Sequence, residues 1–118
     1  ATFYHCKIAW PKPAGDWDIA IAAGVTDVQY IELLGKALPE LFRRFQPDIV
    51  FHVSGCDSLK GDPLANGLMT ADGIARRDKM ILTACEKRKI PYVMTLAGGY
   101  SKNAWKVQSQ SIKGLMRE

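Results

Sequence analysis

The chain has 118 residues, of which 47% are hydrophobic and 24% charged. This balance predicts one domain with a modest core and excludes a disordered chain. No apolar stretch approaches bilayer length and no signal-peptide pattern is present. The net charge of +4 comes from basic clusters among apolar helical positions, so we expect solvated helix faces and neither a membrane nor a nucleic-acid partner.

The three cysteines, Cys6, Cys56 and Cys85, are far apart and form no C-x-x-C pair. This spacing argues against a disulfide framework and against a thiolate zinc site. Together with the missing signal-peptide pattern, it predicts a reducing, cytoplasmic location.

The first part of the chain predicts a strand, a connection and a helix. Residues 2–9 are rich enough in β-branched and aromatic side chains for a strand. The Pro, Gly and Asp content of residues 11–25 predicts a connection without a long regular element. Thr26 and Gln29 have capping-box spacing at the start of a helix, and Pro39 predicts a kink or a break within it. The apolar stripe of this helix consists of Val28, Ile31, Leu34, Leu38, Leu41, Phe42 and Phe45.

The stretch from Pro47 to Pro63, PDIVFHVSGCDSLKGDP, passes from an apolar run into a Gly-rich, acid-bearing loop. Residues 49–53 predict a strand that is covered on both faces in a parallel sheet. Gly55 ends the run, and Asp57 follows at or just past the carboxyl end of the strand. Open α/β sheets bind their ligands at that end, which makes Asp57 a candidate site residue.

The second part of the chain predicts helix, strand and helix. Thr70 is an N-cap candidate for a helix that continues to about Arg88. Its inner side is expected to contain Ile74, Arg77, Met80, Ile81, Ala84 and Cys85, with Arg77 covering the margin by its aliphatic stem. A buried strand follows Pro91 and ends in Gly98-Gly99-Tyr100, and Ser101 is placed to cap the last helix.

The order is therefore β, loop, α, β, α, β, α, which predicts an α/β fold with parallel strands and right-handed crossovers. That topology brings Asp57 and Gly98–Tyr100 to the same edge of the sheet. A carboxylate there can bind a cation, and a tyrosine hydroxyl can donate to an oxygen on which negative charge develops. Alternatively, Asp57 caps a turn and the two glycines only turn the chain. A nucleotide-binding domain is disfavoured, because Gly98-Gly99-Tyr100-Ser101 is not the G-x-G-x-x-G fingerprint.

Two segments, GCDSLKGDPLANGLMTADGIARRD and IPYVMTLAGGYS, closely resemble the C-terminal part of the zinc-dependent histone deacetylase family. Upstream, DWDIAIAAGVTDVQYIELLGKALPELFRRFQPD is similar to the segment that precedes this loop in bacterial deacetylase-like proteins and in the class IV branch. The resemblance covers essentially the whole chain. It implies that residues 1–118 form a single partial histone-deacetylase-like domain with the C-terminal portion of the arginase/deacetylase fold, a parallel sheet with flanking helices.

The resemblance also implies functional residues. Asp57 occupies the position of one of three zinc ligands, and Tyr100 that of the tyrosine which donates to the oxyanion of the tetrahedral intermediate. Gly98 and Gly99 are expected beside the acyl-lysine tunnel, and Leu64 in its apolar wall. These positions imply zinc-dependent hydrolysis of N-acyl-lysine amides.

The Asp-x-His segment that supplies the other two ligands in the family, and its His-His acid/base pair, are absent from this sequence. We therefore expect a catalytically incomplete chain that does not retain zinc alone. The alternative is a non-catalytic, truncated binding or assembly module. Of the two histidines, His52 is expected in the core, and His5 is a weak substitute ligand. Asp62 is interpreted as structural, accepting from backbone amides of its loop.

The missing part of the family fold normally continues the sheet, so this chain is expected to leave a strand edge and part of a sheet face uncovered. We expect a homo-oligomer or a complementing N-terminal chain. The simplest assembly is a two-fold dimer that uses the strand at residues 2–9 or the loop at residues 10–19.

Overall fold

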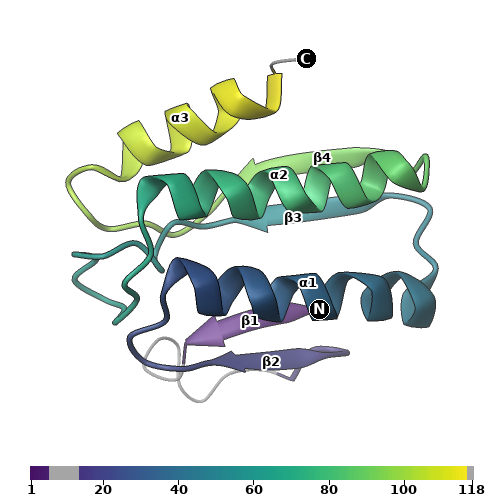
Figure 1. Cartoon of the computed structure of the whole chain (residues 1–118), viewed down its shortest axis with the longest axis horizontal. Coiled ribbons are helices and arrows are strands. Elements are labelled where there is room, and N and C mark those ends of the chain that lie inside the picture. Colours follow the sequence, from purple (N-terminus) through teal and green to yellow (C-terminus); the bar gives the residue numbers. More distant parts are fainter. Residues whose placement is uncertain (6–13, 117–118) are drawn as a thin grey trace.

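The computed structural model describes residues 1–5 and 14–116, except for the side chains of residues 4 and 5. Three helices lie over two pairs of strands, α1 over one pair and α2 over the other (Figure 1). In chain order the elements are β1 (Thr2–His5), β2 (Asp18–Ile21), α1 (Asp27–Phe45), β3 (Val50–Ser54), α2 (Ala71–Lys87), β4 (Tyr92–Leu96) and α3 (Ala104–Met116).

Both strand pairs are parallel. β1 pairs with β2 from Thr2↔Asp18 to His5↔Ile21, and β3 pairs with β4 from Val50↔Tyr92 to Ser54↔Leu96. All four strands point the same way (Figure 1). Their carboxyl ends therefore lie on one side of the molecule, where the loop between β3 and α2 also lies, and the predicted α/β class with parallel strands and flanking helices is confirmed.

The strand β2 corrects the expected order, because it lies inside the predicted connection at residues 11–25. The Asp18 carboxylate accepts the N–H of Gly15 (2.9 Å), which closes the turn before the strand. Thr2 N–H donates to the Trp17 carbonyl (2.9 Å) and continues the pairing of β1 with β2. Of the strand predicted at residues 2–9, residues 2–5 are confirmed as β1, and residues 6–9 lie outside the described part of the chain.

The predicted start of α1 is confirmed. Gln29 N–H donates to Thr26 Oγ1 (3.3 Å), and Thr26 N–H donates to Gln29 Oε1 (3.0 Å). Of the kink or break expected at Pro39, the break is wrong, because α1 continues to Phe45. Buried side chains on both sides of the proline, from Tyr30 to Phe42, anchor the two halves of the helix to the core.

Thr70 caps α2 as predicted, accepting the N–H of Gly73 (3.1 Å). Ser101 does not cap α3: the helix begins only at Ala104, and the Ser101 hydroxyl accepts the N–H of Asn103 (3.2 Å) in the preceding turn. The core joins β2, all three helices and the β3–α2 loop. Its buried members are Ile21, Val25, Tyr30, Leu34, Cys56, Leu59, Met69, Ile74, Ala104 and Val107.

The expectation that residues 49–53 are covered on both faces is wrong. Phe51 is 63% exposed and Val53 is 68% exposed, whereas Ser54 on the α2 side is buried. Because side chains alternate along a strand, one face of the β3–β4 pair packs beneath α2 and the other is open. We call the exposed surface formed by Phe51, Val53 and Val93 the open face.

Candidate functional site

The structure brings Asp57 and Tyr100 together at the carboxyl ends of β3 and β4. Cys56 N–H donates to the Gly98 carbonyl (2.7 Å), which joins the two loops directly after the strands. A Cβ placed on Gly98 would lie 3.3 Å from the Tyr100 hydroxyl oxygen and 3.5 Å from Asp57 Oδ2. The carboxylate and the phenol therefore flank the same glycine, and we call Asp57, Gly98 and Tyr100 the edge site.

Glycines allow the two loops to approach each other. A Cβ at Gly55 would lie 3.0 Å from the Gly98 carbonyl oxygen, and a Cβ at Gly99 would overlap the Cys56 sulfur. Gly99 thus has a packing reason to be glycine, and a side chain at Gly55 would press on the backbone of the other loop. The place of the predicted substrate-binding residues Gly98 and Gly99 beside a tunnel stays a prediction.

Asp62 holds the edge site in place. One of its carboxylate oxygens accepts the N–H groups of Leu64 (2.8 Å) and Ala65 (3.1 Å), and the other accepts the N–H of Tyr100 (2.8 Å). The structural role that the sequence predicted for Asp62 is confirmed, and it extends across both loops. Charge-assisted bonds of this kind are stronger than neutral ones, so Asp62 fixes the backbone that carries Tyr100.

The two side chains expected to contact substrate are accessible. Leu64 is 51% exposed and Tyr100 is 53% exposed. Their roles in a tunnel wall and in oxyanion stabilisation stay predictions.

The described residues do not complete a zinc site. Within residues 1–5 and 14–116, no three His, Cys, Asp or Glu side chains cluster closely enough to hold a metal ion. Next to Asp57, the Cys56 sulfur points toward the Ala104 carbonyl (3.9 Å), and burial raises the pKa of its thiol. A catalytic zinc needs about three protein ligands, so the donor set here, one carboxylate, does not fit zinc without additional residues.

Neither histidine adds a ligand in the described part. His52 is in the core as predicted: its Nδ1 lies 2.7 Å from the Tyr92 hydroxyl and its Nε2 lies 3.8 Å from Asp78. Burial lowers the pKa of His52 to about 4, so this ring is neutral at pH 7. The His5 side chain lies outside the described residues.

A buried polar network behind the edge site was missed in the sequence. Arg77 is 4% exposed and Asp78 is 1% exposed. Arg77 donates to Asp78 (2.9 Å) and to Ser54 (2.7 Å), and Asp78 also accepts from Ser54 (3.0 Å) and from Ser111 (2.5 Å). The expectation that Arg77 covers the helix margin with its stem is therefore wrong. The signal was present, since Arg77 and Asp78 fall within the apolar stripe between Ile74 and Ile81.

The sequence and the fold are similar to those of known proteins. The histone deacetylase domain family matches residues 12–115. Histone deacetylase 2 of Arabidopsis thaliana is 36% identical over 103 residues, which are 87% of this chain and 27% of that protein. The crystal structure of the HDA15 HD domain superposes with a TM-score of 0.69 at 28% identity, covering 82% of this chain and 28% of that one.

An acetylpolyamine aminohydrolase from Burkholderia pseudomallei superposes with a TM-score of 0.68 at 26% identity, covering 83% of this chain and 28% of that one. This chain spans between 21% and 34% of the length of the curated relatives compared with it. The family match covers most of the sequence, and the parallel strands and flanking helices agree with it. The chain belongs to the histone deacetylase domain family.

Proposed function

We propose that this chain forms the C-terminal part of a zinc-dependent amide hydrolase site that acts on N-acyl-lysine. The observation that carries the proposal is the edge site, in which Asp57 Oδ2 and the Tyr100 hydroxyl flank Gly98 at the carboxyl ends of parallel strands. Open α/β sheets bind ligands at this position. Family membership supports the reaction class, because the family is zinc-dependent in general.

Each residue has a separate task in the proposed site. Asp57 contributes one carboxylate ligand, and Tyr100 donates its hydroxyl hydrogen to the oxygen that becomes negative as the amide carbonyl is attacked. Asp62 positions Tyr100 through the backbone N–H. Leu64, Gly98 and Gly99 are proposed to contact the acyl-lysine chain. Two further metal ligands and the acid/base group must come from residues outside this sequence, so the chain alone is proposed to be inactive.

The open face supports an assembly proposal. Phe51 and Val53 are two large apolar side chains on adjacent outward positions of one strand, and such contiguous apolar surface is costly in water. We propose that it is covered by the remaining part of a deacetylase domain, provided by a complementing N-terminal chain, or by a second copy of this chain. No helix in the described part of the chain is both long enough and apolar enough to cross a membrane. A cytoplasmic location is part of this proposal, supported by the free thiols of Cys56 and Cys85.

A non-catalytic binding or assembly module is the second candidate. It is favoured by the single carboxylate of the donor set and by the open face. The two candidates differ in one property: whether the edge site works once the rest of the domain is present.

A chimera separates them. In Histone deacetylase 2 of Arabidopsis thaliana, the matching segment of 103 residues is replaced by this chain. If the proposal is right, the chimera hydrolyses an acetyl-lysine peptide, and Tyr100→Phe lowers turnover by about 10²–10³ while leaving the fold intact. An acetylpolyamine is assayed in parallel, because one of the structurally similar proteins is an acetylpolyamine aminohydrolase.

The matched control is Tyr92→Phe, a tyrosine that contacts His52 within the core and lies away from the edge site. It is expected to change stability more than turnover. If the folded Tyr100→Phe chimera hydrolyses the peptide at an unchanged rate, Tyr100 does not stabilise the oxyanion. The non-catalytic binding or assembly module would then be the better candidate.

A further inference from the structure

The helix layer contains a groove that the deacetylase site does not use. It lies between α1 and α2 and has a volume of about 510 Å³. Its apolar floor is formed by Leu38 and Pro39 of α1 and by Met80 and Ala84 of α2. This volume is in the range of cavities that hold small ligands or anchoring side chains. We call it the α1–α2 groove.

Gly35 of α1 leaves space in the groove. Gly35 has no side chain, and a Cβ placed on it would find only the Met80 methyl carbon, at 3.9 Å. Pro39, four residues later, has no N–H, so the Gly35 carbonyl lacks its usual helical hydrogen bond.

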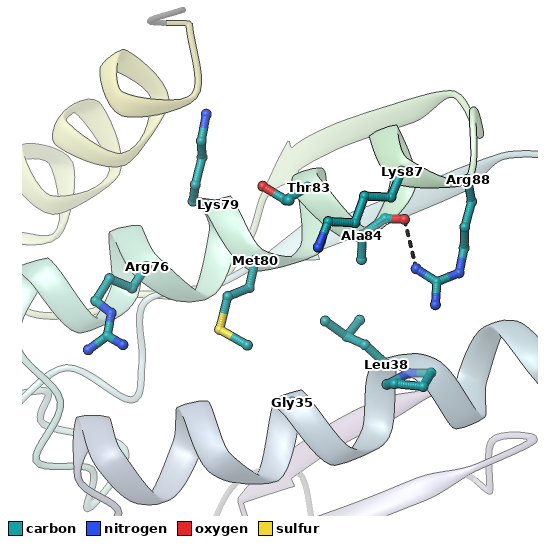
Figure 2. A pocket seen from close by; sticks show the side chains of 10 residues that line it. Gly35, Leu38, Arg76, Lys79, Met80, Thr83, Ala84, Lys87 and Arg88 are labelled. Carbon is teal, nitrogen blue, oxygen red and sulfur yellow. Dashed lines mark hydrogen bonds between the residues drawn. The ribbon is translucent and has the colours of Figure 1, made fainter.

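The rim of the groove is basic. Arg76, Lys79, Lys87 and Arg88 line it, and no acidic residue does. Among the described residues, Arg76, Lys79 and Lys87 form no ion pair. Figure 2 shows Arg76 and Arg88 reaching from α2 at the two ends of the gap, with Met80 and Leu38 facing one another between them, whereas Lys79 points away from α1.

The Arg88 side chain is held in place by two contacts. Its guanidinium donates to the Ala84 carbonyl (3.0 Å) and lies 4.3 Å from the centre of the Phe42 ring. From Arg76 to Arg88 the helix rises about 18 Å, which is the length of about three helical turns. A helical peptide of about three turns matches this length.

We propose that the α1–α2 groove binds an acidic amphipathic peptide segment of a partner protein, with aliphatic side chains between Leu38 and Met80 and carboxylates beside Arg76, Lys87 and Arg88. Charge complementarity selects this occupant, because the apolar floor alone would accept any hydrophobic segment, whereas Arg76, Lys87 and Arg88 at the rim favour an anionic one. The open face of β3 and β4 is turned away from α2, so this binding does not compete with assembly there. The proposal is independent of the amide hydrolase function.

The probe is a 16-residue fluorescent peptide, helical by design, with leucines one turn apart and glutamates on both sides of them. Its twin has glutamine at every glutamate. Anisotropy titration of the full 118-residue chain is expected to show binding of the acidic peptide at low salt. The glutamine twin should bind at least about tenfold more weakly, because exposed ion pairs each contribute up to about 1 kcal/mol.

Two variants locate the binding. Gly35→Leu fills the groove and is expected to abolish binding while leaving the free energy of unfolding equal or higher, since replacing an exposed helical glycine favours the helix. Arg76→Glu with Lys87→Glu should weaken binding at least about tenfold. The control pair, Lys106→Glu with Lys113→Glu on α3, makes the same change in net charge and should bind like the wild type.

Three results would each overturn the proposal: equal binding of the glutamine twin, unchanged binding by Gly35→Leu, or an equal loss in the α3 control pair. The last would mean that net charge, or the surface of α3, determines the binding.

Discussion

The two faces of the β3–β4 pair differ in burial: one is covered by α2 and the other is exposed to solvent. Beneath α2, Ser54 and Asp78 are buried and their side chains are fully engaged in hydrogen bonds with Arg77 and Ser111. On the opposite face, Phe51 and Val53 of the same strand project into solvent. Two adjacent residues, Val53 and Ser54, thus belong to surfaces of opposite character.

This difference indicates which part of the fold is self-sufficient. The helix-covered face has its polar groups paired and its apolar groups packed without help from another chain. The open face has an apolar surface that only an additional layer can bury. The edge site lies at the end of the same two strands, so the complementing N-terminal chain proposed to cover the open face is also the proposed source of the missing site residues.

The largest effect is expected from breaking the buried network. Asp78→Ala leaves the Arg77 guanidinium buried without its carboxylate, and such a change typically costs about 3–5 kcal/mol of unfolding free energy. Chemical denaturation measures the loss. The control, Asp72→Ala, removes an exposed carboxylate from the first turn of the same helix and should cost less than about 1 kcal/mol. Equal losses of unfolding free energy in both variants would show that the buried network stabilises the fold no more than an exposed carboxylate does.

A second effect concerns pH on the same face. Burial lowers the pKa of His52 from 6.5 to about 4, so the unfolded chain binds more protons than the folded chain between these values. Above pH 6.5, His52 is neutral in both states and does not reduce the free energy of unfolding. As the pH falls from 6.5 to about 4, protonation of the unfolded chain lowers the free energy of unfolding by up to about 3 kcal/mol. Denaturation at several pH values should show a smaller decline for His52→Asn, which retains a partner for the Tyr92 hydroxyl. The same decline in both proteins would assign it to carboxylates instead.

The smallest effect on unfolding is expected from the open face. In the monomer, Phe51→Ser with Val53→Thr should change the free energy of unfolding by no more than about 0.5 kcal/mol, because both side chains are in water there. Unfolding is therefore measured at a concentration at which both proteins are monomeric. Light scattering should nevertheless report a change in mass, from at least twice 13.1 kDa to 13.1 kDa. Val28→Ser, at a 73% exposed position of α1, is the control and should leave the mass unchanged. A wild-type monomer would contradict the proposed self-assembly.

Much of the fold could be predicted because the signals are local. Thr26 with Gln29, and Thr70 at the start of α2, satisfy backbone donors within their own first turns, so their spacing in the sequence is sufficient to locate them. The parallel pairing of β3 with β4 also follows from the alternation of strands and helices.

The errors come from interactions between distant residues. β2 is only four residues long, and its pairing with β1 gives it an extended conformation that its Gly- and Asp-rich surroundings do not predict. From the sequence, Arg77 was expected at the margin of the helix. Its burial depends on a network with Asp78, Ser54 and Ser111, and both serines are far from it in the sequence. Phe51 and Val53 are exposed because no described element packs on their side of the strand, whereas their apolar character alone predicted burial.

The location of the edge site could be predicted from the sequence, but the contacts that hold its residues in place could not. Strand order brought Asp57 and Tyr100 to one edge, and the structure puts both beside Gly98. The link from Asp62 to the Tyr100 backbone needed coordinates, because it joins residues 38 positions apart.

Zinc content tests the central claim most directly, since the claim is that this chain holds one ligand of a site completed from outside. The isolated chain and the chimera with Histone deacetylase 2 are dialysed, and their metal is measured by mass spectrometry. The account predicts that the isolated chain retains no stoichiometric zinc, and that the chimera retains one zinc per chain, which is lost in Asp57→Ala. One zinc per isolated chain, lost in Asp57→Ala, would contradict it by showing that this chain completes the site itself.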